Sequence, residues 1–319
     1  MCEPGEYSSK MYEPGQLLEL TAEPSRNTIV VRIHAIPHKF TLSATLVVDV
    51  VSAHESLGLP ARAFLKLNDS RTAHEYRWRH QLGDYTPRAP RRAAQVFAQG
   101  QAARLPGRLP QPRGGHSAAE KEVALKEDLA DELKFELDAY DALHAHQGVS
   151  IPKLYSRVSY VPGKPDIDSD DKKKKNKNNN KKEKMRLGKS PELFRHIDGF
   201  RLTDMPFHIG DLPRGRDRNV RWTAIVEQAR AKVAAVFGAA ADVINRDTRP
   251  ENVMVVVEDD QPPADGGVEP GYSIFLVDLG CCQRRPADMS DRGWREMKTD
   301  QAEADRMKRL ALDHLRPYL

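Results

Sequence analysis

NRDTRPENVMV, residues 245–255, is the stretch that decides how the rest of the chain is interpreted. Asp247 and Asn252 lie five residues apart in a loop that contains a proline and runs into a β-rich segment. Such a loop brings one carboxylate and one amide to the same side of a turn. In phosphoryl transfer the carboxylate accepts or orients the proton of the attacking hydroxyl, and the amide oxygen helps to hold a metal ion. The spacing alone is not specific, because an Asp-x4-Asn pair occurs about once by chance in a chain of this length.

A second acidic position lies downstream in IFLVDLG, residues 274–280. Asp278 follows a short apolar run and stands two residues before Gly280, so we expect it in a turn at the end of a buried strand. Oxygen ligands from Asn252 and Asp278 suit Mg²⁺, which binds a few protein oxygens together with water and phosphate. The alternative is that Asp278 simply ends the strand in a turn.

A lysine inside an apolar strand is the third informative feature. Lys66 lies in AFLKL, residues 63–67, and its burial is costly unless the ammonium has an anionic partner. Glu136 is the preferred partner because it lies beside the apolar stripe of a long predicted helix, and Glu132, one helical turn earlier, is the competing candidate. The alternative is an edge strand whose lysine reaches water.

The patterned segments predict a chain of mixed strands and helices. Residues 27–36 and 40–51 are rich in Val, Ile and Thr and are predicted to pair as strands, followed by the strand AFLKL. A long helix is predicted from Glu120 to about His144, because apolar residues recur at helical spacing: Leu129, Leu133, Leu137 and Tyr140. Further helices are predicted at 222–240 and at about 292–315, and further strands at 252–257 and in IFLVDLG.

Two segments are predicted to be insertion loops, at 85–117 and 162–189. They have few large apolar residues, so burial does not offset the entropy of ordering them. The lysine-rich run at 172–184 also resembles a nucleic-acid or nuclear-localisation patch. Because no aromatic residues are interleaved with the lysines, a solvated insertion is the preferred interpretation, and nucleic-acid binding is the least supported function.

Composition excludes several other classes. The 319 residues carry a net charge of +4, and their 39% hydrophobic content includes no run long enough to span a membrane. The N-terminal ten residues contain no apolar segment typical of a secretory signal. Three cysteines, two of them adjacent, form no disulfide framework or metal motif: Cys2, Cys281 and Cys282. We therefore expect a cytoplasmic or nuclear protein.

Taken in order, five blocks resemble eukaryotic protein kinases. AFLKL, the helix around Glu136, FRHIDGFRLTD, NRDTRPENVMV and IFLVDLG are similar to the lysine strand, helix C, the hinge, the catalytic loop and the metal-binding DFG turn. More narrowly, they resemble the short, divergent kinase-like proteins of filamentous fungi. The resemblance extends from about residue 40 to 300. It implies an α+β, two-lobed fold with an N-terminal extension at 1–26, a β-rich N-lobe at 27–204 that includes both insertions, and a shortened, mainly helical C-lobe at 205–319.

The resemblance also implies roles for individual residues and an ATP- and Mg²⁺-dependent phosphotransferase, with the Ser/Thr type favoured. Lys66 would contact the α- and β-phosphates and pair with Glu136. Asp247 would be the catalytic base, and Arg249 would stand where a phosphate-contacting lysine is usual. Asn252 and Asp278 would hold Mg²⁺. The phosphate acceptor, a protein or a small molecule, is not identified by these blocks.

Departures from the kinase pattern support an alternative, an inactive kinase-like scaffold that mediates protein interactions. No G-x-G-x-x-G occurs between the first two predicted strands, where a loop covering the phosphates is expected. Asn245 replaces the usual histidine of the catalytic loop. Only 39 residues follow Gly280, so we expect a reduced platform for a protein substrate. Retention of Lys66, Asp247, Asn252 and Asp278 favours the enzyme.

Overall fold

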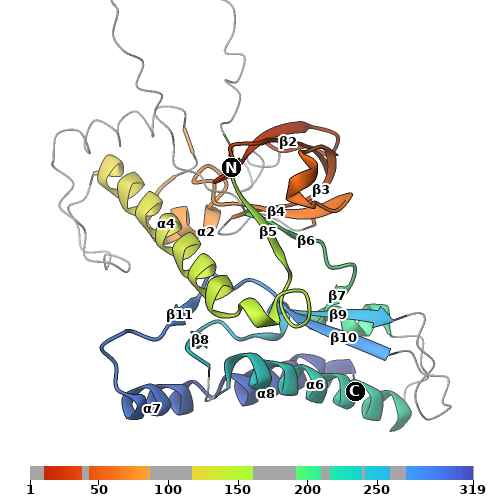
Figure 1. The fold of residues 1–319 in the computed structure, drawn as a ribbon. Helices are drawn as coiled ribbons and strands as arrows, with labels where there is room; N and C mark the ends of the chain where they lie inside the picture. Colours follow the sequence, from red (N-terminus) through yellow and green to blue (C-terminus); the bar gives the residue numbers. More distant parts are fainter. Residues whose placement is uncertain are drawn as a thin grey trace, which may run out of the picture. The chain divides into compact units, whose positions relative to one another are not determined.

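The structure is a computed structural model that describes residues 11–37, 43–83, 85–86, 117–160, 192–209, 216–238, 241–258 and 271–318 (Figure 1). Apart from residues 85, 86 and 117, the two predicted insertions lie outside these ranges. The chain forms two compact units. The first unit comprises Met1–Ala89 and Tyr155–Leu193, and the second comprises Pro90–Leu154 and Phe194–Leu319.

The first unit is built around a closed β-barrel with the strand order β1-β2-β3-β4-β6-β5. Antiparallel ladders join β1 to β2, β2 to β3, β3 to β4 and β1 to β5. A short helix, α2, follows β4. The strand bounds are β1 Leu17–Glu23, β2 Thr28–Ala35, β3 Ala44–Ser52, β4 Arg62–Leu67, β5 Leu154–Tyr160 and β6 Glu192–Arg195, and α2 spans His74–Arg79. The predicted strands at 27–36, 40–51 and 63–67 are confirmed for their described residues.

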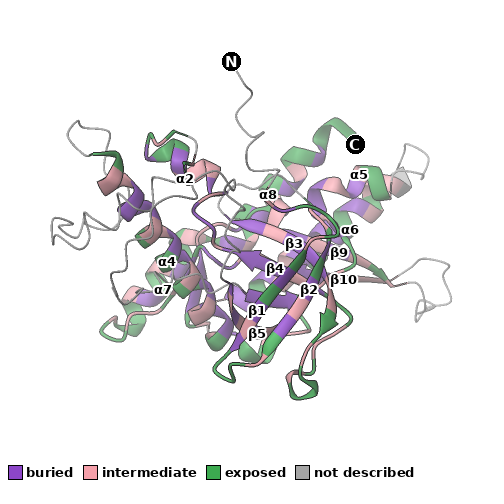
Figure 2. Ribbon diagram, turned by 90° about the horizontal axis from the view of Figure 1, so that it is seen from above, coloured by how far each residue is buried: buried purple, intermediate pink, exposed green. Residues whose placement is uncertain are grey.

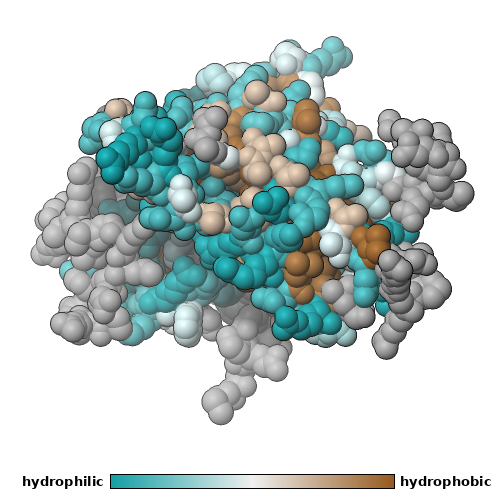
Figure 3. All heavy atoms as spheres, turned by 90° about the horizontal axis from the view of Figure 1, so that it is seen from below, coloured by the Kyte–Doolittle hydropathy of each residue, from teal (hydrophilic) through white to brown (hydrophobic). Residues whose placement is uncertain are grey.

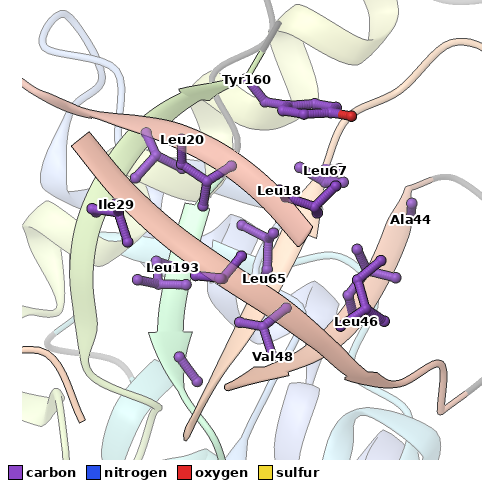
Figure 4. Close-up of a cluster of buried hydrophobic side chains, with 14 of the residues drawn as sticks. Leu18, Leu20, Ile29, Ala44, Leu46, Val48, Leu65, Leu67, Tyr160 and Leu193 are labelled. Atoms are coloured by element: carbon purple, nitrogen blue, oxygen red, sulfur yellow. The ribbon is translucent and has the colours of Figure 1, made fainter. Parts of the chain in front are cut away.

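Side-chain alternation explains why these strands close into a barrel. In β1 and β2 every second residue is buried, as Figure 2 shows along both strands, because successive side chains point to opposite faces. The inward side chains form one apolar core, drawn in Figure 4. Closure also removes free strand edges that another chain could pair with. The labelled core residues are Leu18, Leu20, Ile29, Ala44, Leu46, Val48, Leu65, Leu67, Tyr160 and Leu193.

The prediction of an N-terminal extension at 1–26 is wrong for its described residues. β1 lies within that range and pairs with both β2 and β5. Tyr12 is fully buried, and its hydroxyl donates to Asp69 Oδ2 at 2.8 Å. Arg71 completes this cluster with Nε and Nη2 at 2.8 and 2.6 Å from the same oxygen. The segment before β2 is therefore an integral part of the barrel, tied to the loop after β4.

The second unit contains the long helix α4, Ala118–Ala142, close to the predicted bounds. Its start is defined by a capping box in which Ser117 Oγ accepts from the Glu120 N–H and the Glu120 carboxylate accepts from the Ser117 N–H. The predicted apolar stripe is only half correct. Leu129 and Tyr140 are buried, whereas Leu133 and Leu137 are half-buried.

The buried face of α4 instead includes the two glutamates considered as partners of Lys66. Glu132 is 6% exposed and Glu136 is 2% exposed. The physical reason is the packing of α4 against β11, Cys282–Arg284, and the turn before it. A Cβ on Gly280 of that turn would lie 2.9 Å from Glu132 Cγ, so the Glu132 side chain packs on the turn in the space that a larger residue at 280 would occupy.

The remaining helices pack mainly on one another. α6, Arg216–Phe237, contacts α8, Glu303–Leu315, and begins earlier than the predicted start at Trp222. The predicted continuous helix at 292–315 is in fact two helices, because Ala302 takes a left-handed conformation (φ 42°, ψ 46°) between α7, Asp291–Gln301, and α8. Short helices complete the unit: η2 His144–His146, η3 Leu202–Asp204, α5 Met205–His208, η4 Pro250–Asn252 and η5 Arg316–Tyr318.

Two small sheets lie in the second unit. One has the strand order β10-β9-β7 and the other pairs β11 with β8. Their bounds are β7 Phe200–Arg201, β8 Val243–Asn245, β9 Val253–Glu258 and β10 Gly271–Leu276. The strands predicted at 252–257 and in IFLVDLG are thus present. The predicted N-lobe boundary at residue 204 differs from the observed division, because residues 118–154 belong to the second unit.

The surface is mainly hydrophilic with separate apolar patches, as Figure 3 shows for one face. Phe207 is 74% exposed and contacts Tyr318 edge-on, with ring centroids 6.1 Å apart. Within the part of the chain that the structure describes, no helix combines the length and apolarity needed to cross a membrane.

Candidate functional site

Two strand ladders bring the two acidic segments of the second unit together. β8 pairs with β11 through Asn245 and Cys282, and β9 pairs with β10 through Val253 and Leu276 (Figure 1). The loop from β8 to β9, residues 246–252, and the turn from β10 to β11, residues 277–281, are therefore clamped at both ends. We call them the Asp247 loop and the Asp278 turn.

Backbone hydrogen bonds hold the loop directly against the turn. The Val277 N–H donates to the Asn252 carbonyl at 2.9 Å, and the Arg246 N–H donates to the Cys281 carbonyl at 3.3 Å. These bonds join the loop to the first and the last residue of the Asp278 turn. The loop and the turn therefore behave as one structural element, which positions their side chains better than either segment alone.

The internal structure of the Asp247 loop follows from its sequence. Asn245 Oδ1 accepts from the Asp247 N–H at 2.9 Å, and the Asn245 carbonyl accepts from Thr248 Oγ1 at 3.0 Å. Pro250 begins η4, and Arg249 before it is extended (φ −140°, ψ 156°), as expected for a residue that precedes proline. Asn245 thus anchors the loop by its own side chain and carbonyl.

Asp247 and Asn252 meet as the sequence predicts. Asn252 Nδ2 donates to the Asp247 carbonyl at 3.1 Å and to Asp247 Oδ2 at 3.2 Å. Because the amide NH₂ faces Asp247, Oδ1 is the Asn252 atom that remains to accept from a donor or to bind a cation. The orientation expected of a metal-binding asparagine is therefore built into the loop.

Burial and the neighbouring groups shift the pKa of Asp247, some upward and some downward. Burial raises the pKa of Asp247, and the negative charge of Asp278 raises it further. The Arg249 guanidinium, with Nη2 at 3.0 Å from Asp247 Oδ2, and the Asn252 amide act in the opposite direction on that pKa. Two carboxylates are thus close enough to repel each other, which favours binding of a cation.

Asp278 takes a left-handed backbone conformation with φ 58°. Few residues other than glycine adopt it, although Asp and Asn tolerate it better than most. Its neighbour Leu279 is fully buried, so the turn presents the Asp278 side chain while Leu279 packs inward. Such local strain is found disproportionately at functional sites.

The two glutamates of α4 lie near the Asp278 turn and the first residue of β11. Glu132 packs against Gly280, and the charge of Glu136 adds to the burial that raises the pKa of the Cys282 thiol. The raised pKa favours the neutral thiol form of the buried Cys282. The choice between Glu136 and Glu132 as partner of Lys66 stays a prediction.

Lys66 lies in the first unit, whereas the other candidate residues lie in the second. It is 7% exposed and sits on β4 between Leu65 and Leu67, whose side chains enter the barrel core, so Lys66 points to the opposite face. β4 is an inner strand of a closed barrel, so the explanation of Lys66 as an edge-strand lysine is wrong. Pairing of Lys66 with Glu136 would join the two units and stays a prediction.

The oxygen donors fit magnesium better than a transition metal. Among the described residues no group of three or more His, Cys, Asp or Glu side chains is arranged to hold a metal ion. Asn252 and Asp278 offer one amide oxygen and one carboxylate, the sparse oxygen set that Mg²⁺ uses when phosphate and water supply its other ligands.

Sequence reasoning missed two residues that contact this site. Glu303 Oε1 accepts from the Asn245 N–H at 2.6 Å, and Lys298 Nζ lies 3.2 Å from Glu303 Oε2. Both are buried. No motif marks them in the sequence.

No protein-family model matches the sequence, and no curated protein matches it either. The chain is similar in structure to the Rio2 kinase–ADP/Mg²⁺–phosphoaspartate complex from Chaetomium thermophilum, with 9% identity, coverage of 90% of this chain and 54% of that one, and a TM-score of 0.42. It is also similar to the ROP18 kinase domain in complex with AMP-PNP and sucrose, with 11% identity, coverage of 90% and 63%, and a TM-score of 0.47.

A third similar structure is ROP2 from Toxoplasma gondii, described as a virulence factor with a protein-kinase fold and no enzymatic activity, with 11% identity, coverage of 88% and 58%, and a TM-score of 0.35. The chain spans less than two thirds of each of these three proteins. At TM-scores below 0.5 these likenesses by themselves assign neither a fold family nor an activity to the chain.

Proposed function

We propose that the chain is an ATP- and Mg²⁺-dependent phosphotransferase of the protein-kinase type that acts on serine or threonine hydroxyls. The observation that carries the proposal is the convergence of Asp247, Asn252 and Asp278 on two segments clamped by paired strands. The order of the five kinase-like sequence blocks supports it. Lys66 and Glu136 enter the proposal through that resemblance.

Asp247 would act as the general base. It accepts the proton of the acceptor hydroxyl while that oxygen forms a bond to the γ-phosphorus; the bond from the γ-phosphorus to the β–γ bridging oxygen breaks, and ADP leaves. The Asn252 amide holds the Asp247 carboxylate in place. A base works best when its pKa approaches the working pH, and burial raises the pKa of Asp247 in that direction.

The remaining residues would bind the nucleotide. Arg249, paired with Asp247, is close enough to the carboxylate to contact a transferring phosphate, and Lys66 would contact the α- and β-phosphates. Mg²⁺, held by Asn252 Oδ1 and the Asp278 carboxylate, would neutralise the phosphate charge. Catalysis of this kind depends on positioning and electrostatics, not on a covalent intermediate.

A non-catalytic kinase-like scaffold is the second candidate. Two observations favour it: residues 27–51 contain no G-x-G-x-x-G, and the ion pair with Arg249 engages Oδ2, one of the two carboxylate oxygens of Asp247. A scaffold of this kind binds nucleotide, or no ligand at all, without transferring phosphate. It differs from the enzyme in one measurable property, the transfer of phosphate.

A transfer assay separates the two candidates. The full chain is incubated with Mg²⁺ and γ-labelled ATP, and label is measured on the chain itself and on casein as a generic serine and threonine acceptor. Asp247→Asn removes the base but keeps its shape. General-base catalysis contributes typically 10²–10⁴-fold, so we expect transfer to fall by about that factor.

Asp313→Asn is the matched control, because Asp313 is an exposed carboxylate on α8 of the same unit. We expect this variant to transfer phosphate as the parent chain does. Transfer at the parental rate by Asp247→Asn would show that Asp247 is not the base. Nucleotide binding without any transfer by the parent chain would leave the scaffold.

A further inference from the structure

We propose that Lys298 and Glu303, a buried ion pair at the junction of α7 and α8, act as positioning residues that hold the Asp247 loop in its working geometry. The inference deepens the proposed function and rests on it. It assigns to the C-terminal helices a task at the site, in addition to their packing on α6.

Glu303 makes the direct contact with the loop. Its Oε1 accepts from the Asn245 backbone N–H at 2.6 Å. Asn245 is the last residue of β8, and its own side chain and carbonyl bond Asp247 and Thr248. A carboxylate on this N–H therefore fixes the residue from which the loop is organised. Hydrogen bonds to charged groups are about twice as strong as neutral ones.

Lys298 holds the chain that leads into the loop. Its Nζ donates to the carbonyls of Phe237, at the end of α6, and of Val243, at the start of β8, the latter at 2.6 Å. Its third interaction is with Glu303 Oε2 at 3.2 Å. The ammonium has three N–H groups, so these partners account for all of its donors. Lys298 thus ties together α6, β8 and the carboxylate that binds Asn245.

A further hydrogen bond joins α7 to the segment between α6 and β8. Trp294 Nε1 donates to the Ala241 carbonyl at 3.0 Å, and Lys298 Nζ lies 5.9 Å from the centre of the Trp294 ring. The left-handed Ala302 bends the chain between the two helices, immediately before Glu303. The bend places Lys298 and Glu303, five residues apart, on a common site that a straight helix would not provide.

A purely structural role explains this arrangement less well. Two apolar residues of similar size would remove the cost of burying two charges, but they would leave the Asn245 N–H and the Phe237 and Val243 carbonyls without these partners. Burial raises the pKa of Glu303 and lowers that of Lys298, and their mutual attraction opposes both shifts. The charges are directed at backbone groups that lead into the Asp247 loop, which is the reason we assign them a positioning role.

Amide hydrogen exchange and nucleotide affinity together test the inference. In Glu303→Gln and in Lys298→Met we expect the Asn245 N–H to exchange about 10- to 100-fold faster, while amides in the middle of α6 change less. In the double variant Lys298→Met/Glu303→Leu both charges are gone. We expect its thermal midpoint to recover above that of either single variant, while Asn245 exchange stays fast and the affinity for Mg²⁺-ATP falls by about tenfold.

Asp305→Asn is the matched control, because it breaks an exposed ion pair of α8 with Arg230 of α6 and leaves Asn245 untouched. We expect Asn245 exchange in this variant to equal that of the parent chain. Equal acceleration at Asn245 and in α6 in every variant, or parental Asn245 protection in the double variant, would overturn the inference. If the parent chain binds no nucleotide while Asn245 behaves as expected, the positioning role stands and the proposed phosphotransferase fails.

Discussion

The Asp247 site and the Tyr12–Asp69–Arg71 cluster both surround a carboxylate with polar partners. The two carboxylates differ in burial and in how far neighbouring groups compensate their charge. Asp69 is fully buried and receives hydrogen bonds from Tyr12, from the Arg71 side chain and from the Arg71 N–H at 2.9 Å. Asp247 is half-buried, faces the second carboxylate Asp278 and has a raised pKa. A closed, neutral cluster serves stability, whereas an unbalanced, accessible one is suited to a cation and a phosphate.

The largest effect on stability is expected from a substitution in the Tyr12–Asp69–Arg71 cluster. Asp69→Ala removes the acceptor of the Tyr12 hydroxyl and of the Arg71 N–H, Nε and Nη2 groups and leaves the Arg71 charge partly buried. We therefore expect a loss of about 3 kcal/mol in the free energy of unfolding. Urea denaturation of the full chain measures it. Because the proposed function gives no role to the three residues of this cluster, phosphate transfer per folded molecule should change little; a selective loss of activity without a loss of stability would contradict the structural role.

Gly280→Ala is expected to have the next largest effect, on the second unit. A Cβ at this position would lie 2.9 Å from Glu132 Cγ and 3.0 Å from Glu132 Oε1. Relieving that overlap requires the buried Glu132 side chain, α4 or the Asp278 turn to shift, at a cost of about 1–3 kcal/mol. The same substitution in the background of Glu132→Ala should cost much less, and an undiminished penalty there would contradict the observed packing.

The pH dependence of stability tests the uncompensated charge at Asp247. The folded-state pKa of Asp247 is raised, so between its ordinary value near 3.8 and its folded value the folded chain binds more protons than the unfolded chain. Ionisation of Asp247 therefore lowers stability as pH rises through that window. We expect Asp247→Asn to raise the thermal midpoint at pH 7 relative to the parent chain, with a smaller difference at pH 3.5. A lowered midpoint at pH 7 would contradict the unbalanced charge.

The smallest effect is expected at Ala302. A non-glycine residue with φ 42° is strained, so Ala302→Gly should stabilise the chain by roughly 0.5–1 kcal/mol, net of the greater freedom of glycine in the unfolded chain. Thermal denaturation measures the difference. Ala304→Gly, inside α8, is the control and should destabilise by a similar amount.

The sequence predicted those parts of the fold that local patterns control. The strands around Lys66, the helix that carries Glu136 and the meeting of Asp247 with Asn252 all follow from residues near one another in the chain. β1 was missed although its side chains alternate, because its place in the barrel depends on pairing with β5, more than 130 residues away. The Tyr12 hydroxyl likewise finds Asp69 across 57 residues.

The break at Ala302 shows a second limit. Alanine has the highest helix propensity, so nothing local marks this position as the end of α7. Tertiary contacts override that preference, because Lys298 and Glu303 reach Phe237, Val243 and Asn245 only if the chain bends between them. The same contacts were invisible to motif analysis. Propensity and spacing therefore led to the candidate residues Asp247 and Asn252 but not to Lys298 and Glu303.

The central claim, that the Asp247 loop and the Asp278 turn form one magnesium–nucleotide site, is tested most directly by ligand-dependent thermal stabilisation. The full chain is heated with ATP and Mg²⁺ together and separately, beside Asp278→Asn, which removes the carboxylate while keeping a side chain that tolerates the left-handed backbone. We predict a shift that requires both ligands, corresponding to about 2.7 kcal/mol at a hundredfold excess over Kd, and its loss in the variant. An equal shift in Asp278→Asn, or no shift in the parent chain, would contradict the account.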